Sequence, residues 1–237
     1  MAKKHEEIVF SDDIIAIIED KVGYVFEDKD VLLTAFTHAS YANEHGVPSY
    51  ERLEFLGDSV LNLVVANYLC LKYPNANEGF LTKARAKVVS EKSLADVVKK
   101  IGLYKYIRSS SGSISEEVRK SDAVKCDLFE AITGAILWDK KDLAAAEHYV
   151  LSMLETKLNE DFTLDSVTDY KSKLLEHCAH TGEDVKFDVQ QINEKPNSGF
   201  VAKVYVDSQE MGCGEGVSKK KAEQSAAKVA YIILCQG

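Results

Sequence analysis

The sequence predicts a multi-domain protein in which an all-α domain is followed by a small α+β domain. Two observations support this division. From residue 12 to about residue 157, apolar residues recur at intervals of three and four, as on one face of a helix, and no convincing alternating strand interrupts them. From residue 169 the predicted order is helix, three strands and helix (α-β-β-β-α), which is typical of two helices packed on one face of an antiparallel sheet.

Four apolar runs mark helices of the first domain, which we place at residues 1–157. They are Ile14/Ile17/Ile18, Leu53/Leu56/Val60/Leu63/Val64, Leu94/Val97/Val98/Ile101 and Ile132/Ala135/Ile136. The glycine and proline of "GVP" (46–48) interrupt the chain just before the second run. The serine-rich stretch "SSSGSISEE" (109–117) predicts a polar loop between helices.

The rest of the chain is predicted to form a linker and a second domain at residues 169–237. Residues 158–168, "LNEDFTLDSVT", are polar and acidic with little periodicity, which indicates the linker. A helix follows at 169–180, "DYKSKLLEHCAH". The stretches "VKFDVQQI" (185–192) and "FVAKVYV" (200–206) then alternate as half-buried strands do, with a hairpin loop at Lys195–Gly199 between them.

Two more elements complete the second domain. "EMGCGEGVS" (210–218) predicts a third strand that its glycines weaken. "KKKAEQSAAKVAYIIL" (219–234) predicts a closing helix. Its expected buried face consists of Ala222, Ala226, Val229, Ala230 and Ile233.

Composition narrows the class of protein. With 46% apolar and 28% charged residues, a chain of 237 residues can bury a core without disulfides. The five cysteines are scattered without C-x-x-C spacing, so we expect a reducing compartment and neither a disulfide framework nor a zinc site. We find no signal peptide and no apolar stretch that approaches about 18 residues, and therefore predict a cytoplasmic protein with no membrane partner.

The net charge of −9 limits any nucleic-acid surface to a local patch. Residues 1–163 hold 20 Lys/Arg against 27 Asp/Glu, and the remaining residues hold 9 against 11. Proteins that bind nucleic acid usually show a basic patch, and the distribution of charge matters more than its sum. Neither part of the chain is basic as a whole.

The segment "ERLEFLGDSVL" (51–61) predicts a helix with three carboxylates on one stripe. Glu51, Glu54 and Asp58 lie at i, i+3 and i+7, opposite the apolar stripe. A solvated face is the common explanation for such a stripe. Phe55 argues against it here, because the helical wheel places this large ring among the acids.

Beyond Asp58 the same helix is apolar on all sides, and such a helix is buried on all sides. Either a second layer of the same chain or another subunit must cover it. Gly57 permits a neighbouring backbone to approach closely, at some cost in helix propensity.

A second acidic pair, Asp127 and Glu130, lies in "KCDLFEAITGAILWD" (125–139) at the i, i+3 spacing of helix neighbours. Carboxylates at the mouth of a buried helix are costly unless they are paired or bind a cation. If the two helices pack with their acids facing, Glu54, Asp58, Asp127 and Glu130 form a four-carboxylate cage. Oxygen ligands without histidine or thiolate favour Mg²⁺ or Mn²⁺, and such an ion suits phosphodiester hydrolysis because it polarises the phosphate and activates water.

Segments along the whole chain resemble the ribonuclease III family. "YERLEFLGDSVL" (50–61) is similar to the signature helix of that family. "LLTAFTHASYAN" (32–43), "NEGFLTKARAKVVS" (77–90) and "CDLFEAITGAIL" (126–137) resemble its other motifs in the same order. The last third of the chain, with "GEGVSKKKAEQSAA" (214–227), resembles a double-stranded-RNA-binding domain.

This resemblance implies a homodimeric endonuclease that cuts double-stranded RNA by Mg²⁺-dependent hydrolysis, with Mn²⁺ as an alternative ion. It implies 5′-phosphate and 3′-hydroxyl ends, and processing of ribosomal, messenger and small RNA precursors. The resemblance implies that the metal is held by Glu54, Asp58, Asp127 and Glu130. Of these, Asp58 and Glu130 would be the catalytic residues most sensitive to substitution. It also implies that Glu51 and Glu78 are accessory acids of the cleavage valley and that Phe55 lies at the dimer interface.

In the second domain the resemblance implies recognition of A-form shape through 2′-hydroxyls and phosphates. We expect Lys219 and Lys220, preceded by Ser218 as the helix N-cap, to face a phosphate, although a lysine run can also be a solvated helix start. Family members often carry glutamine in the first helix of this domain where the present chain has Leu175 and Ala179. Lys173, Glu176 and His177 are then expected to serve the RNA-binding face.

Two other classes of protein remain open from the residues alone. One is a double-stranded-RNA binder that does not cut, and the presence of all four metal-binding acids disfavours it. The other is an acidic helical oligomer with solvated carboxylates, which leaves Phe55 and the C-terminal lysines unexplained. His38 could act as a general base, but we expect it to fix local structure or to contact RNA.

Overall fold

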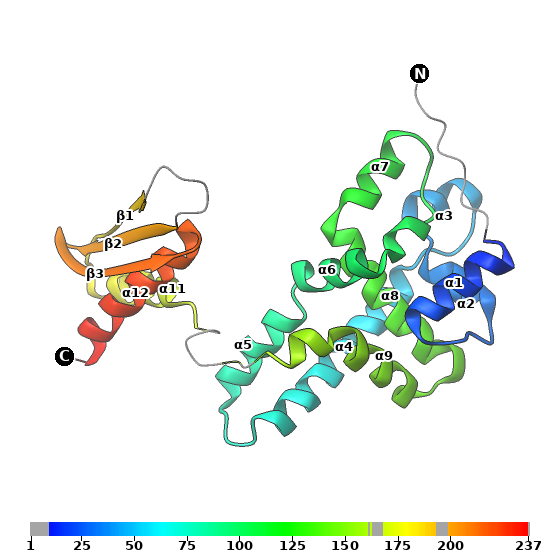
Figure 1. Cartoon of the computed structure of the whole chain (residues 1–237), viewed down its shortest axis with the longest axis horizontal. Helices are drawn as coiled ribbons and strands as arrows, with labels where there is room; N and C mark the ends of the chain where they lie inside the picture. The colour runs from blue at the N-terminus through cyan, green and yellow to red at the C-terminus, as the bar shows by residue number, and fades with distance from the viewer. Residues whose placement is uncertain (1–9, 161, 163–167, 193–198, 237) are drawn as a thin grey trace. The chain divides into compact units, whose positions relative to one another are not determined.

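Each of two parts of the chain has its own hydrophobic core. Figure 1 shows the helices of the first part and the strands and helices of the second. The computed structural model describes residues 10–160, 162, 168–192 and 199–236, and it divides into the units Met1–Val167 and Thr168–Gly237. The first unit is helical and the second has the order α-β-β-β-α, which confirms the predicted fold class. The predicted linker and hairpin loop lie largely outside the described residues.

Helices alone build the first unit over its described residues. They are α1 (Asp12–Val22), α2 (Lys29–Ala35), α3 (Ala39–His45), α4 (Glu51–Lys72), α5 (Glu78–Val88), α6 (Glu91–Ile101), the 3₁₀ turn η1 (Leu103–Tyr106), α7 (Ser113–Lys120), α8 (Asp122–Lys140) and α9 (Leu143–Leu158). Local signals set their ends: Asn77 and Ser90 cap helix N-termini with their side chains, while Gly23 and Gly46 end helices in the left-handed conformation.

The polar loop predicted at 109–117 is shorter than expected, because α7 already begins at Ser113. This short helix has one buried side and one exposed side. Ser115 and Val118, three residues apart, are both buried, while Lys120 and Glu116 form an i, i+4 ion pair on the exposed side. Tertiary burial of one face therefore turns a polar sequence into a helix.

The helices α4 and α8 carry most of the first core. Leu61, Val65 and Leu69 of α4 are fully buried, as are Phe129 and Ile132 of α8. Of the two covers expected for α4 beyond Asp58, a second layer of the same chain is contradicted for part of the helix, and coverage by another subunit stays a prediction. Leu63 is 57% exposed and Leu71 is 76% exposed.

One helix among the described residues, α4, is long and apolar enough to cross a membrane by length and composition, which corrects the expectation that no segment approaches that limit. The same helix carries Glu51, Glu54 and Asp58, and its buried side chains belong to the core of the first unit. Core helices commonly pass a test of length and composition, so the finding is weak evidence for a membrane span.

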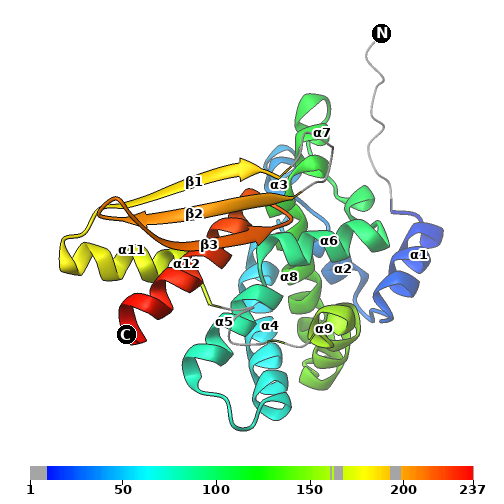
Figure 2. The ribbon, with the colours of Figure 1, turned by 60° about the vertical axis from the view of Figure 1, so that its left-hand side comes forward.

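The second unit consists of α11 (Tyr170–Thr181), β1 (Val185–Gln191), β2 (Phe200–Val206), β3 (Gln209–Gly216) and α12 (Lys219–Gln236). The strands form an antiparallel sheet in the order β1-β2-β3, with Phe187 opposite Val204. Figure 2 shows both helices on one face of this sheet. Ala202, Val204 and Val206 alternate towards that face and are buried there.

The buried face of α12 differs from the predicted one. Ala222, Ala226 and Ala230 are fully buried, whereas Val229 and Ile233 are 41% and 50% exposed. Small residues meet at this interface, since a Cβ atom on Gly212 of β3 would lie 2.4 Å from the Ala226 carbonyl oxygen. Such close packing favours alanine over branched side chains. Ala227, which was not predicted to be buried, completes the buried surface in place of Val229 and Ile233.

Candidate functional site

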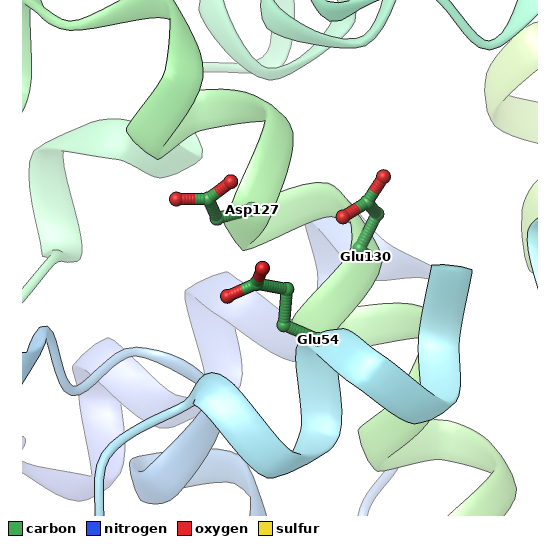
Figure 3. A group of neighbouring side chains, drawn as sticks. All are labelled: Glu54, Asp127 and Glu130. Atoms are coloured by element: carbon green, nitrogen blue, oxygen red, sulfur yellow. The ribbon is translucent and has the colours of Figure 1, made fainter. Parts of the chain in front are cut away.

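Three carboxylates from two helices converge in the first unit (Figure 3). Glu54 projects from α4, while Asp127 and Glu130 project from α8. One carboxylate oxygen of each residue lies within 4.8 Å of those of the other two, and all three residues are half-buried. The arrangement brings together three of the four residues to which the sequence assigned a metal.

A close crossing of α4 and α8 produces this proximity. A Cβ atom on Gly57 would lie 1.8 Å from the Glu130 carbonyl oxygen, and one on Gly134 would lie 2.0 Å from the Leu53 carbonyl oxygen. Only glycine fits at either position, so the two backbones nearly touch. Glu54 lies one turn before Gly57, and Glu130 lies one turn before Gly134, which places both carboxylates at the crossing.

The pKa values of all three carboxyl groups are raised. Burial, followed by the neighbouring carboxylates of Asp58, Asp127 and Glu54, raises the pKa of Glu130 to about 7. The pKa of Glu54 is raised by burial and then by Asp127 and Glu51. Burial also raises the pKa of Asp127. No lysine or arginine in the described ranges forms an ion pair with Glu54, Asp127 or Glu130.

Asp58 lies outside this group of three. Its side chain is exposed, and Asn62, one turn later on α4, donates from Nδ2 to Asp58 Oδ1 at 2.7 Å. Asp58 is nevertheless the first charged neighbour that raises the pKa of Glu130. Its carboxylate is therefore near the cluster and is held by a local hydrogen bond.

The two accessory acids occupy exposed helix N-termini. Ser49 Oγ donates to Glu51 Oε2 at 2.7 Å at the start of α4, and Thr82 Oγ1 donates to Glu78 Oε1 at 2.8 Å at the start of α5. Glu51 contributes to the raised pKa of Glu54, so it belongs to the edge of the cluster. The structure does not bring Glu78 into the group.

Phe55 is 78% exposed on α4. Beside it lies an open hollow of about 660 Å³, whose lining includes Val31, Leu56 and Trp138. Trp138 is itself 52% exposed. The first unit thus presents a large ring and an apolar hollow on one surface.

The basic residues predicted in the second unit fall into two settings. Lys219 and Lys220 are exposed in the first turn of α12, where Ser218 Oγ accepts the Lys221 backbone N–H at 3.3 Å and acts as the cap. Lys173 and His177 instead lie on the side of α11 that faces α12. The Lys173 ammonium is 5.5 Å from the ring centroid of Tyr231, and the His177 ring meets the same ring at 6.3 Å.

The outer face of α11 carries different residues. Ser172, Leu175, Glu176 and Ala179 are exposed there, so Lys173 and His177 do not share the face of Leu175 and Ala179. A wheel of α11 at about 100° per residue already places the two pairs on opposite sides, whereas the contact with Tyr231 is tertiary and could not be read from it.

His38 makes a hydrogen bond that fixes the start of α3. Its Nδ1 accepts the Ser40 backbone N–H at 3.1 Å and so caps α3. Burial lowers the pKa of His38, which favours the neutral ring that this contact needs. The structure therefore gives His38 a role in local structure, as we expected.

Two residues beside the cluster were not foreseen from the sequence. The Tyr50 hydroxyl donates to Asp127 Oδ2 at 3.2 Å, and the Cys126 thiol lies 3.8 Å from Glu130 Oε1. Burial, Glu130 and Asp127 raise the pKa of this thiol, so it stays protonated. Cys126 is next to Asp127 and Tyr50 is next to Glu51 in the sequence, and this adjacency was the available signal for both.

Comparisons with known proteins cover most of the chain. A family model described as ribonuclease-III-like matches residues 28–158, and one described as a double-stranded RNA binding motif matches residues 170–234. Ribonuclease 3 of Streptococcus gordonii is 40% identical over 235 residues, which cover 97% of this chain and 96% of that protein. Ribonuclease 3 of Lactiplantibacillus plantarum is 39% identical over 230 residues, which cover 94% and 98% respectively.

Solved structures match the first unit. A crystal structure of the nuclease domain of ribonuclease III from Campylobacter jejuni is 35% identical, with a TM-score of 0.56, and the match covers 62% of this chain and 98% of that domain. A second structure of that domain, at 36% identity and a TM-score of 0.55, concerns a region involved in its dimer formation.

Proposed function

The chain belongs to the ribonuclease III family and is an endoribonuclease specific for double-stranded RNA, and from that premise we propose that it hydrolyses its substrate with a divalent cation, Mg²⁺ by preference, bound at the α4–α8 crossing. The residues that would hold the ion are Glu54, Asp58, Asp127 and Glu130. Mn²⁺ offers a similar preference for oxygen and would substitute. The products would carry 5′-phosphate and 3′-hydroxyl ends.

The single observation that carries this proposal is the convergence of Glu54, Asp127 and Glu130 without a positively charged partner among the described residues. Half-buried carboxylates held this close repel one another, and this repulsion adds to burial in raising the pKa of Glu130. A cation relieves that repulsion, and an all-oxygen donor set fits Mg²⁺ or Mn²⁺. When bound, such an ion stabilises negative charge on a phosphate that is under attack by water.

The residues of this chain have distinct parts in the proposed reaction. Glu54, Asp127 and Glu130 fix the ion at the helix crossing. Asp58 approaches from the exposed side of α4, where the Asn62 amide keeps its carboxylate in place. We assign the greatest sensitivity to Asp58 and Glu130, and an accessory role along the cleavage valley to Glu51 and Glu78.

Substrate recognition would combine both units. The exposed Lys219 and Lys220 at the N-terminus of α12 suit a backbone phosphate, because free N–H groups and positive charge meet there. Lys173 and His177 would contribute from the margin of the α11 face, since both are engaged with Tyr231. Structured ribosomal, messenger and small RNA precursors are the proposed cytoplasmic substrates.

The proposed enzyme is a homodimer. Phe55 stands exposed beside an apolar hollow, and a second copy of the chain related by two-fold symmetry could bury both rings at once. The match to a nuclease domain with a region involved in dimer formation supports this assignment.

The direct test is to incubate a long RNA duplex with the protein in the presence and absence of Mg²⁺, with single-stranded RNA and duplex DNA as controls. We expect cutting of duplex RNA only, and only with the ion. Duplex RNA that is bound but left intact in Mg²⁺ would favour a binding protein without nuclease activity.

Asp58→Asn and Glu130→Gln should abolish cleavage while the affinity for duplex RNA is retained, because only the cation site changes. Glu155→Gln, at an exposed position of α9, is the matched control and should cut normally. Near-normal cutting by either site variant would refute the assignment of that residue.

A further inference from the structure

Tyr50 connects the two helices of the site from outside the cluster of acids. It immediately precedes α4, yet its hydroxyl donates to Asp127 Oδ2 on α8 at 3.2 Å. The residue is only 4% exposed, so water does not compete freely for this contact. Asp127 on α8 therefore accepts a hydrogen bond from the residue at the start of α4.

The tyrosine is itself fixed on several sides. Its backbone N–H donates to the Thr37 carbonyl at 2.9 Å, and its carbonyl accepts the backbone N–H groups of Leu53 and Glu54 at 2.8 and 2.9 Å. The His38 and Tyr50 rings pack in a T-shaped arrangement, with centroids 5.9 Å apart. The hydroxyl therefore has a defined position relative to the first turn of α4, which carries Glu54.

The direction of the hydrogen bond is also defined. A phenol has one O–H to donate and an ionised carboxylate can only accept, so the Tyr50 hydroxyl is the donor in this contact. A donor to one carboxylate oxygen leaves the other oxygen of Asp127 available to a cation. Groups that orient metal ligands in this way typically change metal affinity tenfold to a hundredfold when they are removed.

We propose that Tyr50 is a positioning residue for the metal site, which holds the Asp127 carboxylate in register with Glu54 and Glu130. The inference rests on the proposed function and deepens it, because it adds a residue that touches neither the ion nor the RNA. It also explains why an aromatic residue stands buried at a helix start where its side chain makes no capping contact.

The test is to measure Mn²⁺ binding by calorimetry to the full-length protein without RNA, for the wild type and for Tyr50→Phe. The substitution removes the hydroxyl and keeps the ring, and we expect the dissociation constant to rise at least about tenfold. Tyr149→Phe is the matched control, because Tyr149 is equally buried and its hydroxyl has no hydrogen-bond partner in the described part of the chain. This variant should bind Mn²⁺ like the wild type.

A second measurement separates positioning from a general effect on structure. The cleavage rate of Tyr50→Phe should recover to within about threefold of the wild type as Mg²⁺ is raised, since the ligands themselves are intact. An unchanged Mn²⁺ affinity in Tyr50→Phe, an equal loss in Tyr149→Phe, or a rate that stays low at saturating Mg²⁺ would each overturn the inference. Failure of the wild type to bind Mn²⁺ would instead overturn the proposed function.

Discussion

At the scale of single residues, the site places carboxylates where they are electrostatically unfavourable without an ion. Glu130 is the clearest case, because burial and three neighbouring acids raise its pKa from 4.5 to about 7. A carboxyl group whose pKa is higher in the folded than in the unfolded chain destabilises the folded chain once it ionises. Its contribution to stability therefore falls as the pH rises from about 4.5 to about 7.

This sign leads to a prediction for the metal-free protein. Glu130→Gln should raise the free energy of unfolding at pH 8 by about 1–2 kcal/mol, less than the full pKa shift would give because the group is partly solvated. The gain should vanish about one pH unit below the unfolded-state pKa, where Glu130 is protonated in both states. Chemical unfolding in the presence of a chelator at both pH values measures it. A variant that is no more stable than the wild type at pH 8 would contradict the proposed repulsion.

Some residue positions could be predicted from the sequence and others could not. The i, i+3 spacings placed Glu51 with Glu54 and Asp127 with Glu130, whereas the meeting of the two helices was a supposition that the structure bears out for Glu54, Asp127 and Glu130. The hydrogen bond from Asn62 that holds Asp58 outside the group was not foreseen, because a side-chain contact one turn away competes with convergence and no periodicity encodes it.

At the scale of elements, the crossing of α4 and α8 determines whether the site exists. The apolar spacing predicted both helices, and the glycine in α4 suggested that something packs against it. The sequence alone could not identify the partner, because the contact of Gly57 with Gly134 joins segments far apart in the chain. The same limit applies to α12, whose buried face depends on the glycines of β3 and so differs from the wheel.

The crossing can be tested with two glycines in helices. Gly57→Ala should lower the free energy of unfolding by about 3 kcal/mol or more, because its Cβ would lie 1.8 Å from backbone that cannot move independently. Gly79→Ala in α5 is the control, since its Cβ would meet nothing nearer than 3.7 Å. That variant should be neutral or up to about 1 kcal/mol more stable, as expected from helix propensity. Equal stability changes in thermal or urea unfolding would refute the close crossing.

At the scale of the whole molecule, the chain divides the work between two units with separate cores. The acids lie in the first unit, and the exposed lysines at the start of α12 lie in the second. The change from helical to alternating periodicity predicted this division, whereas the facing of Lys173 and His177 towards Tyr231 depends on tertiary packing within the second unit.

Removal of residues 168–237 should therefore affect binding more than chemistry. We expect KM for duplex RNA at about 0.15 M salt to rise at least tenfold, with kcat within about threefold of the full chain, because phosphate contacts are lost and the acids are not. Steady-state cleavage by the shortened protein across a salt series measures both constants. If KM at about 0.15 M salt were the same for the shortened protein and the full chain, the second unit would be dispensable for substrate binding.

The assembly of two chains is the last level, and Phe55 is the residue that tests it. A ring that is 78% exposed in one chain gains about 1.5–3 kcal/mol on burial, and two-fold symmetry would bury it twice. Phe55→Ala should therefore raise the dissociation constant of the dimer at least about a hundredfold, as measured by sedimentation at low concentration. Leu71→Ala controls for loss of an exposed apolar side chain, since Leu71 is 76% exposed at the other end of the same helix. If both variants sediment like the wild type, Phe55 lies outside the interface, and the apolar hollow beside it has another occupant.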